Sequence, residues 1–292
     1  METENILDIT FDRMTVMGDL GDNRVSNLIF LIKRFSITRE NRIHISDSRY
    51  HDRVQGKFLD DLVYFEYDRL KAKAYNTRNF RIEFNPNKLN QEQIEWLQQN
   101  VISMLSDVGI TRLDLAFDVD FKLSDYQFIS IGNAREKSTV EFRNSLSALE
   151  TKYIGKRESD KMIRLYDKKV EQMKQGNEVD LPHWWRLEFE LKRETVDEFA
   201  DVFETLQIKK PDLMEIEKVQ DRAMLYFLRD HPEEWSKLAK ATRAKYRKML
   251  REIKNKNMTP LFKKELKKKK AELMAQLDGW FKNQYIVFES NN

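Results

Sequence analysis

A short motif recurs in this chain: an arginine, then an apolar residue, then a carboxylate or a phenol. In a β-strand successive side chains point to opposite faces, so each copy buries its apolar residues and presents its polar pair on the other side. Such strands predict a sheet with one hydrophobic face and one charged face. The four copies are Arg81-Ile82-Glu83-Phe84, Arg112-Leu113-Asp114-Leu115, Arg186-Leu187-Glu188-Phe189 and Arg164-Leu165-Tyr166.

One copy carries a tyrosine, Tyr166, where the others carry an acid. The alternation of a strand places Arg164, Tyr166 and Lys168 on the same face, so the phenol is expected between two cations. Nearby cations lower the pKa of a phenol and also attract a phosphate, and both effects suit phosphoryl transfer to a tyrosine nucleophile. The alternative is a purely structural tyrosine of a strand.

The same alternation puts several carboxylates on the polar side of their strands. Like charges a few ångströms apart raise each other's pKa unless a cation lies between them. Hard oxygen ligands favour Mg²⁺ or Mn²⁺, so one interpretation is a divalent metal site. The other is a lattice of arginine–carboxylate pairs on a solvated sheet face, with no metal. The carboxylates are Glu83, Asp114, Asp118, Glu188 and Glu190.

The bulk composition narrows the class of protein. The chain has 292 residues, 40% hydrophobic and 35% charged, which is enough for one large or two medium globular domains. It contains no cysteine, so we expect no disulfide framework and a reducing, cytoplasmic location. No run of about 18 apolar residues is present, and no export signal is expected at the acidic N-terminus.

Hydrophobic periodicity and the turn-forming residues between periodic segments predict an α+β body followed by a helical segment. The body is expected to comprise residues 1–230 and the helical segment residues 231–292. The expected strands are Phe11–Met17, Leu62–Tyr67, Phe80–Asn85, Arg112–Asp118, Met162–Tyr166 and Trp184–Leu191. The expected helices are Asn90–Val108, Thr195–Thr205, Asp212–Arg229, Glu233–Ile253 and Pro260–Lys282.

The helical segment is strongly basic. From Trp235 to Lys270 there are fifteen Lys or Arg against two Glu, although the whole chain has a net charge of only +3. A basic block of this density favours a polyanion, most often nucleic acid, as partner. The alternative is a solvated lysine-rich helix face. Around Ala241–Lys254 in the helix expected over Glu233–Ile253, cations adjoin an apolar stripe, so the helix can dock on its own domain while it offers guanidinium groups to DNA.

Five blocks of the sequence resemble the replication initiator proteins of rolling-circle plasmids from Gram-positive bacteria, of the Rep_trans type. They occur in the family's order and span nearly the whole chain. The blocks are Asn79–Leu89, Thr111–Asp118, Thr151–Lys169, Trp185–Arg193 and Trp235–Ile253.

The resemblance implies a DNA strand transferase that nicks and rejoins one strand at the plasmid's double-strand origin. It implies a mostly antiparallel sheet, a 5′-phosphotyrosine intermediate on Tyr166, and help from Arg164 and Lys168 in stabilising the transferring phosphate. The histidine pair of the wider nickase superfamily is missing here, so the acids are the expected ligands of Mg²⁺ or Mn²⁺. They are Asp114 and Glu188 first, with Glu83, Asp118 and Glu190.

The resemblance also places origin recognition in the segment after Trp235, and implies a homodimer and a host helicase of the PcrA type as partners. The DNA-binding residues expected there are Arg243, Lys245, Arg247, Lys248, Arg251 and Lys254. Two alternatives remain open: a conjugative-element relaxase with the same chemistry, and a non-catalytic DNA-binding protein with the same fold.

Overall fold

The structure is a computed structural model that describes residues 4–48, 50–130, 138–146 and 148–281. The chain divides into two compact units. Unit 1 comprises Met1–Asp8, Phe117–Glu188 and Ala200–Lys268, and unit 2 comprises Ile9–Ala116, Phe189–Phe199 and Lys269–Asn292. Because β1, β6, β11 and α7 each continue from one unit into the other, several motifs of the sequence are divided between them.

Unit 2 is built on strands that follow the order β2-β3-β4-β5-β1-β6-β11. The pairs β2–β3, β3–β4, β4–β5 and β5–β1 are all antiparallel. In β4 and β5 every second residue is buried, which is the pattern of a sheet with one face packed on a core. The strands are β1 (Ile6–Leu20), β2 (His44–Asp47), β3 (Arg53–Phe58), β4 (Val63–Asp68), β5 (Phe80–Phe84), β6 (Leu105–Val119) and β11 (Trp185–Lys192).

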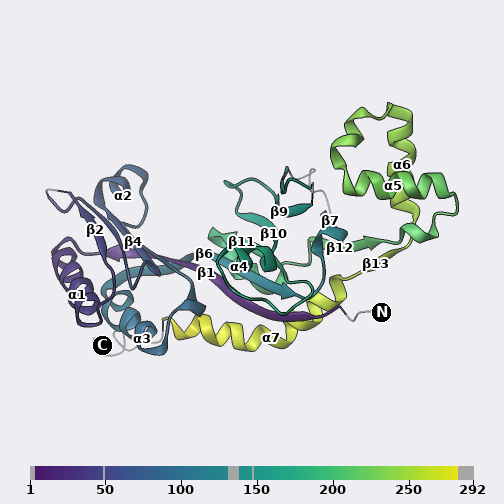
Figure 1. Ribbon diagram of the computed structural model, residues 1–292. Helices are drawn as coiled ribbons and strands as arrows, with labels where there is room; N and C mark the ends of the chain where they lie inside the picture. Colours follow the sequence, from purple (N-terminus) through teal and green to yellow (C-terminus); the bar gives the residue numbers. More distant parts are fainter. Residues whose placement is uncertain (1–3, 49, 131–137, 147, 282–292) are drawn as a thin grey trace. The chain divides into compact units, whose positions relative to one another are not determined.

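Two helices pack together beside these strands (Figure 1): α1 (Val25–Thr38) and α3 (Gln91–Asn100). Phe35 of α1 stacks on Trp96 of α3 with ring centroids 4.2 Å apart, and Phe58 of β3 meets the same indole edge-on. The core of unit 2 therefore lies on the apolar face of its strands. A short helix, α2 (Arg69–Tyr75), begins at the capping side chain of Asp68.

Unit 1 contains the continuation of β6 and β11 and the strand order β11-β10-β9-β8, with β8 (Thr139–Arg143), β9 (Leu149–Ile154) and β10 (Lys161–Asp167). Strands β9 and β10 are antiparallel, and Tyr166 of β10 lies opposite Thr151 of β9. A separate sheet has the order β13-β12-β7, formed by β13 (Asn255–Asn257), β12 (Leu206–Pro211) and β7 (Gln127–Ser130).

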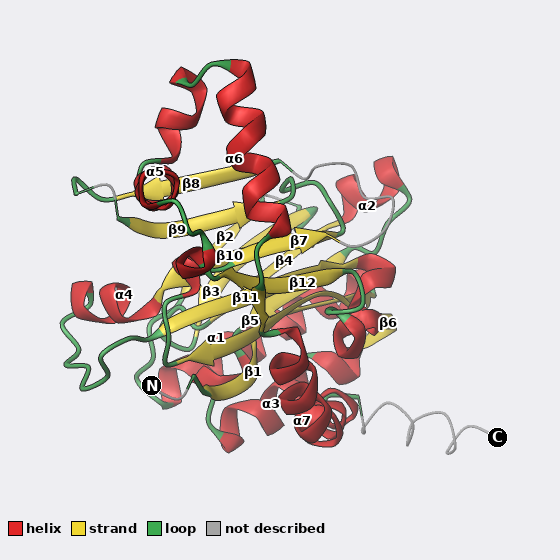
Figure 2. Cartoon of the chain, turned by 90° about the vertical axis from the view of Figure 1, so that its right-hand side faces the viewer, coloured by secondary structure: helices red, strands yellow, loops and turns green. Residues whose placement is uncertain are grey.

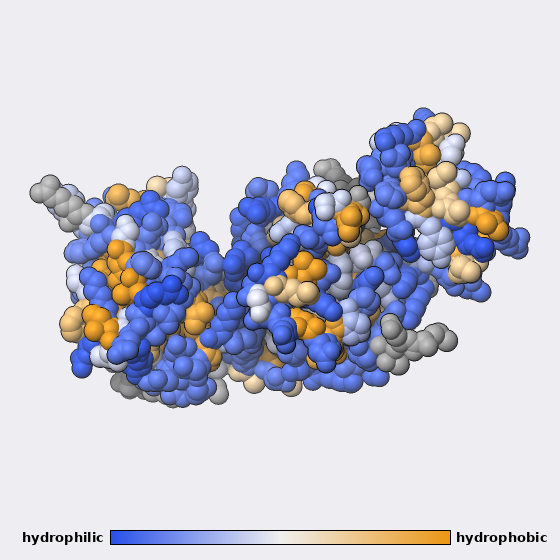
Figure 3. Space-filling view, viewed as in Figure 1, coloured by the Kyte–Doolittle hydropathy of each residue, from blue (hydrophilic) through white to orange (hydrophobic). Residues whose placement is uncertain are grey.

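The helices of unit 1 are α4 (Lys168–Lys174), α5 (Val219–Asp230), α6 (Lys240–Glu252) and the first part of α7 (Thr259–Gly279). Figure 2 shows α5 and α6 as neighbouring helices, and they share a small core around Leu225, Leu228 and Tyr246. Phe262 of α7 is fully buried among the rings of other aromatic residues of unit 1. Hydrophilic residues cover much of the visible surface, with apolar patches between them (Figure 3).

The predicted fold class is confirmed: the molecule combines a large, mostly antiparallel sheet with packed helices. Two predicted helices are wrong in their extent. The helix expected over Asn90–Val108 ends at Asn100, because the chain from Leu105 joins the sheet as β6. The helix expected over Thr195–Thr205 is a 3₁₀ helix, Arg193–Asp201, and the following residues pair in β12.

The C-terminal helices match the expectation in number and order but begin or end at different residues. The predicted helix Glu233–Ile253 is a 3₁₀ turn, Pro232–Lys237, followed by α6. The last helix ends at Gly279, and residues 282–292 of the predicted basic segment lie outside the described residues. Within the described residues, no helix combines the length and the apolar character that a membrane crossing requires.

Candidate functional site

Tyr166 lies in β10 with its ring flanked by the two cations that the sequence predicted. Ile163 and Leu165 are buried on the opposite side of the strand. The Arg164 guanidinium carbon lies 4.6 Å from the centre of the Tyr166 ring, and Lys168 Nζ lies 5.6 Å from it. Lys168 is not part of the strand: it begins α4, and its ammonium donates to Glu171 at 2.6 Å.

The charge environment of Tyr166 differs from the expectation in one respect. Tyr166 as a residue is only 7% exposed, and burial raises the pKa of its phenol above the ordinary value. Arg186 and Arg164 lower that pKa, and Glu188 raises it, but burial is the largest contribution. The expectation that cations give Tyr166 a lowered pKa is therefore wrong for the protein alone, because burial outweighs the arginines.

Two carboxylates of unit 1 are paired with arginines around this strand. Glu188 accepts a hydrogen bond of 2.6 Å from Arg164, and Asp118 accepts two of 2.7 Å from Arg186. Charge-assisted, bidentate contacts of this kind hold a guanidinium in a fixed orientation. Arg186 is 8% exposed, so a fixed buried cation contributes to the electrostatics of Tyr166. Arg186 was not among the predicted site residues, although it stands in one of the four repeated motifs.

The other three predicted metal ligands belong to unit 2. Arg112 bridges two of them: its Nη2 donates to Asp114 at 2.7 Å and to Glu190 at 2.6 Å. Burial raises the pKa of Asp114 despite the adjacent guanidinium. Burial also disfavours the ionised form of Glu83, but Arg13 and Arg81 outweigh it and lower the pKa of that carboxyl.

These contacts bear on the metal prediction. The five acids offer the hard oxygen donors that Mg²⁺ and Mn²⁺ prefer. Each acid, however, contacts an arginine, and the described part of the chain holds no group of three or more histidine or acidic side chains arranged around a common point. The donor chemistry fits a divalent ion, and the present arrangement uses guanidinium groups as the counter-charges.

The predicted DNA-binding residues of α6 separate into two groups. Arg243 donates to the carbonyl oxygens of Ser236 and Leu238 at 2.9 and 3.0 Å. Lys245 donates to the buried carboxylate of Asp221 at 2.6 Å. These two cations thus fasten α6 to its own unit.

The remaining cations of this set are exposed. Arg247 lies over the ring of Trp235, 5.9 Å from its centre, and Lys254 pairs with Glu215 at 3.1 Å. Lys248 pairs with Glu252 at 3.7 Å, a separation typical of a weak surface contact. Arg247, Lys248 and Arg251 therefore form the exposed cationic side of α6. The small residue Ala244 lies between them and the start of the helix.

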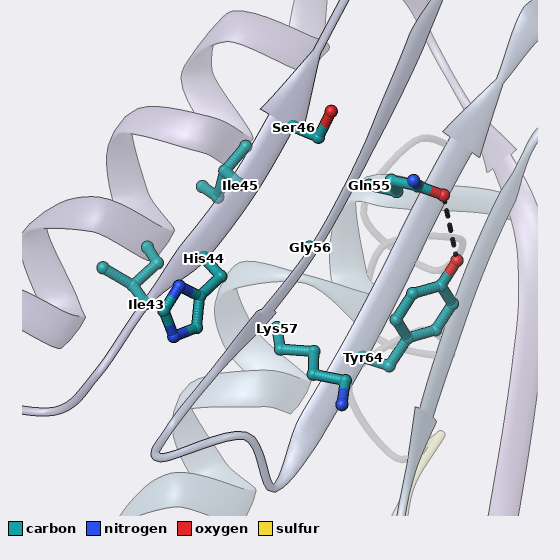
Figure 4. Close-up of a pocket in the computed structure, with 8 residues that line it drawn as sticks. All are labelled: Ile43, His44, Ile45, Ser46, Gln55, Gly56, Lys57 and Tyr64. Carbon is teal, nitrogen blue, oxygen red and sulfur yellow. Dashed lines mark hydrogen bonds between the residues drawn. The ribbon is translucent and has the colours of Figure 1, made fainter.

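A hollow of about 530 Å³ lies on β2, β3 and β4 in unit 2, away from all of these residues in the sequence (Figure 4). Gly56 lies in the middle of the lining residues (Figure 4). Position 56 requires glycine, because a Cβ there would come within 2.3 Å of the His44 carbonyl oxygen on β2. The hollow contains none of the predicted site residues. Its lining is Ile43, His44, Ile45, Ser46, Gln55, Gly56, Lys57 and Tyr64.

Comparison with known proteins places this chain in a family. Residues 108–285 match the sequence pattern of the Rep_trans family, described as replication initiation factor, and residues 13–105 match that of a replication initiation protein N-terminal region, RepD-like_N. The chain belongs to the Rep_trans family of replication initiation factors. The Rep_trans match includes Tyr166 and every predicted metal ligand except Glu83, which lies in the N-terminal match.

Relatives of this Rep_trans chain include two replication initiation proteins from Staphylococcus aureus. One is 40% identical over 273 residues, covering 93% of this chain and 84% of the relative. The other is 42% identical over 272 residues, covering 92% and 83%. A rolling-circle replication initiator protein from Geobacillus stearothermophilus aligns with a TM-score of 0.42 and 17% identity, covering 70% of this chain and 86% of that one.

Proposed function

We propose that this Rep_trans protein initiates rolling-circle replication of a plasmid by nicking and rejoining one DNA strand at the double-strand origin. The observation that carries the proposal is Tyr166, a strand tyrosine whose ring lies against Arg164 and Lys168 in a chain of this family. The staphylococcal relatives named as replication initiation proteins support the biological role.

In the proposed reaction the Tyr166 oxygen attacks the phosphorus of one phosphodiester. The new bond joins tyrosine to the 5′ phosphate, and the bond from phosphorus to the 3′ oxygen breaks. The phenolic proton leaves to a base or to solvent, and the released 3′ oxygen takes up a proton to become the primer hydroxyl. Because one phosphate ester replaces another, the bond energy is retained and the reverse reaction can rejoin the strand.

The role of Arg164 is to place positive charge where the transferring phosphate gains negative charge. Its Nη2 donates to Glu188, while its buried Nε has no hydrogen-bond partner among the residues that the structure describes. A phosphate oxygen beside the Tyr166 ring would supply that partner. Lys168 adds a second cation from the start of α4.

A divalent ion, Mg²⁺ or Mn²⁺, would supply further charge stabilisation when bound. Within unit 1, Asp118 and Glu188 are the carboxylates proposed as ligands of such an ion. Within unit 2, the proposed ligands are Glu83, Asp114 and Glu190. Ion binding requires that the arginine pairs described above open, because the same oxygens cannot serve both cations at full strength.

Origin recognition is proposed for residues 231–292, through Arg247, Lys248 and Arg251 of α6. Cations on an exposed helix face can contact phosphates, which is sequence-independent, or guanine edges, which is sequence-specific. A homodimer and a host helicase of the PcrA type complete the proposed machinery, and a cytoplasmic location follows from that role.

The test is relaxation of supercoiled plasmid carrying the cognate origin. We expect the wild-type protein to convert it to open and relaxed circles with Mg²⁺, and Tyr166→Phe to lose this activity by at least about 10³-fold because the nucleophile is gone. Tyr153→Phe is the matched control, since Tyr153 lies opposite Arg164 on the neighbouring strand, and it should retain activity. Full relaxation by Tyr166→Phe would exclude this residue as the nucleophile.

A further inference from the structure

We infer that Phe142, on the edge strand β8, is a stacking site for an unpaired base of the DNA strand that reaches Tyr166. The inference rests on the proposed function, in which Tyr166 attacks one DNA strand. It adds a binding residue that takes no part in the proposed chemistry. The occupant of the site is single-stranded DNA next to the phosphate that Tyr166 attacks.

Strand β8 exposes its apolar residues and shields its charged ones. It is the last strand in the order β11-β10-β9-β8, and Figure 2 shows it beside β9. Val140 and Phe142 are 51% and 56% exposed, whereas Glu141 and Arg143 are half-buried and form an ion pair of 2.8 Å. A strand with one face toward water ordinarily carries polar residues on that face, and charged residues commonly protect an edge strand. The reversed pattern of β8 is that of a contact surface.

Strand register places Phe142 on the same face of the sheet as Tyr166. Residues directly opposite each other in paired strands point to the same face. Phe142 lies opposite Thr151 of β9, and Thr151 lies opposite Tyr166 of β10. Because neighbouring strands are about 4.8 Å apart, Phe142 lies about 10 Å across the sheet from Tyr166. A DNA strand with one phosphate at Tyr166 can therefore bring a neighbouring base to Phe142.

Aromatic and guanidinium groups follow one another across this face. The ring of Tyr153 meets that of Phe142 edge-on, with centroids 6.0 Å apart and an interplanar angle of 81°. Tyr153 in turn lies opposite Arg164, whose guanidinium lies over the Tyr166 ring. Unpaired bases stack on aromatic rings and on guanidinium planes, so this row suits a single strand that crosses β8, β9 and β10.

Exposed cations lie at one end of the same strands. Lys156 and Arg157 are exposed in the turn that joins β9 to β10, with the exposed acid Glu158 after them. Gly155 N donates to Ser138 O at 2.8 Å, which brings this turn to the start of β8. An oligonucleotide offers a base to cover the Phe142 ring and phosphates to pair with the cations. The bases of a duplex are already stacked on their neighbours, so the base that covers the ring must be unpaired.

The test measures binding of a fluorescein-labelled oligothymidylate to the full chain by fluorescence anisotropy across a salt series. For Phe142→Ala we expect Kd to rise roughly tenfold at every salt concentration, the effect of losing one base–ring stack. The slope of log Kd against the logarithm of the salt concentration should stay as in the wild type, because no phosphate contact is lost. Phe142→Trp should bind at least as tightly as the wild type. Phe142→Leu should lose nearly as much affinity as Phe142→Ala, because leucine is apolar but has no ring.

The matched control is Phe30→Ala. Phe30 of α1 is 59% exposed, close to the value for Phe142, but it belongs to unit 2. Its Kd for the oligothymidylate should stay within about twofold of the wild type. Both alanine variants replace exposed rings, so their midpoints of thermal unfolding should stay near that of the wild type and show that they fold.

Wild-type affinity in folded Phe142→Ala or Phe142→Leu would overturn the inference. An equal loss of affinity for a fully paired duplex would also overturn it, because the site would then have no preference for unpaired bases. So would a lower oligomeric mass of Phe142→Ala in sedimentation velocity with an unchanged Kd, which would assign the exposed face of β8 to a second copy of the chain.

These outcomes are distinguishable from a failure of the proposed function. Origin nicking by a wild-type chain whose Phe142→Ala variant binds the oligothymidylate normally would leave the function intact and remove only the stacking site. Weakened binding by Phe142→Ala, in a protein whose wild type forms no covalent DNA adduct, would keep the stacking site and reject the function.

Discussion

At the scale of single residues, the acids of the charged strand faces take their arginine partners both along one strand and across strands. The sequence motif indicates a pair within each copy, and Arg112 does contact Asp114 two residues away. Arg186, however, contacts Asp118 on another strand, which leaves Glu188 to Arg164. Strand register decides between these partners, and register depends on pairing across long stretches of chain that the motif does not contain.

The tyrosine gives a pH prediction at this scale. Because burial raises the pKa of Tyr166, the phenol carries its proton at neutral pH, and the attacking phenolate becomes more abundant as pH rises. We expect the logarithm of the single-turnover cleavage rate of a single-stranded origin oligonucleotide to rise with pH between about 6 and 9, with a slope of about one. The measurement is quenched-flow cleavage at constant ionic strength and saturating Mg²⁺.

A pH-independent rate over that range, with chemistry shown to be rate-limiting, would mean that proton loss from the phenol does not limit attack. Lys168→Gln is a useful companion variant. It removes a cation 5.6 Å from the ring, so the rate at each pH should fall while the slope is kept.

At the scale of elements, side-chain alternation and local turn signals predicted the strands whose position depends on residues adjacent in the sequence. Strands β4, β5, β10 and β11 lie within about two residues of their predicted limits, because each shows the two-residue period on its own. Strand β12 was missed, because it is defined by partners more than forty residues away in either direction, β7 and β13. Helix α1 was also missed: it is rich in β-branched residues, and no side chain caps its start at Arg24.

Helix α6 gives the second prediction. Arg247 and Arg251 are exposed, whereas Arg243 is held by two backbone carbonyls. We expect the double variant Arg247→Gln with Arg251→Gln to bind duplex origin DNA more weakly. The slope of log K against the logarithm of the salt concentration should become shallower by about two, one for each lost phosphate contact. Fluorescence anisotropy across a salt series measures both quantities.

The thermal stability of that double variant should match the wild type. Arg243→Gln should behave in the opposite way, with a lowered midpoint of unfolding because two hydrogen bonds to carbonyls are lost. Cleavage of a single-stranded oligonucleotide by the double variant should be near normal. Equal loss of cleavage and of duplex binding would contradict a separate recognition role for α6.

At the scale of the whole molecule, the carboxylates that the sequence predicts as metal ligands are divided between the two units. The sequence groups five carboxylates by strand alternation alone. The structure assigns Asp118 and Glu188 to unit 1 with Tyr166, and Glu83, Asp114 and Glu190 to unit 2, and it gives an arginine to each. The family match over residues 108–285 spans parts of both units, so the proposed activity belongs to the whole chain rather than to either unit.

The central claim is that Tyr166 becomes covalently joined to DNA. The most direct measurement is mass spectrometry of the protein after reaction with an origin oligonucleotide, followed by nuclease and protease digestion. The account predicts a peptide containing Tyr166 that carries a 5′-linked nucleotide through its phenolic oxygen. An adduct on any other residue, or origin nicking with no adduct, would contradict it.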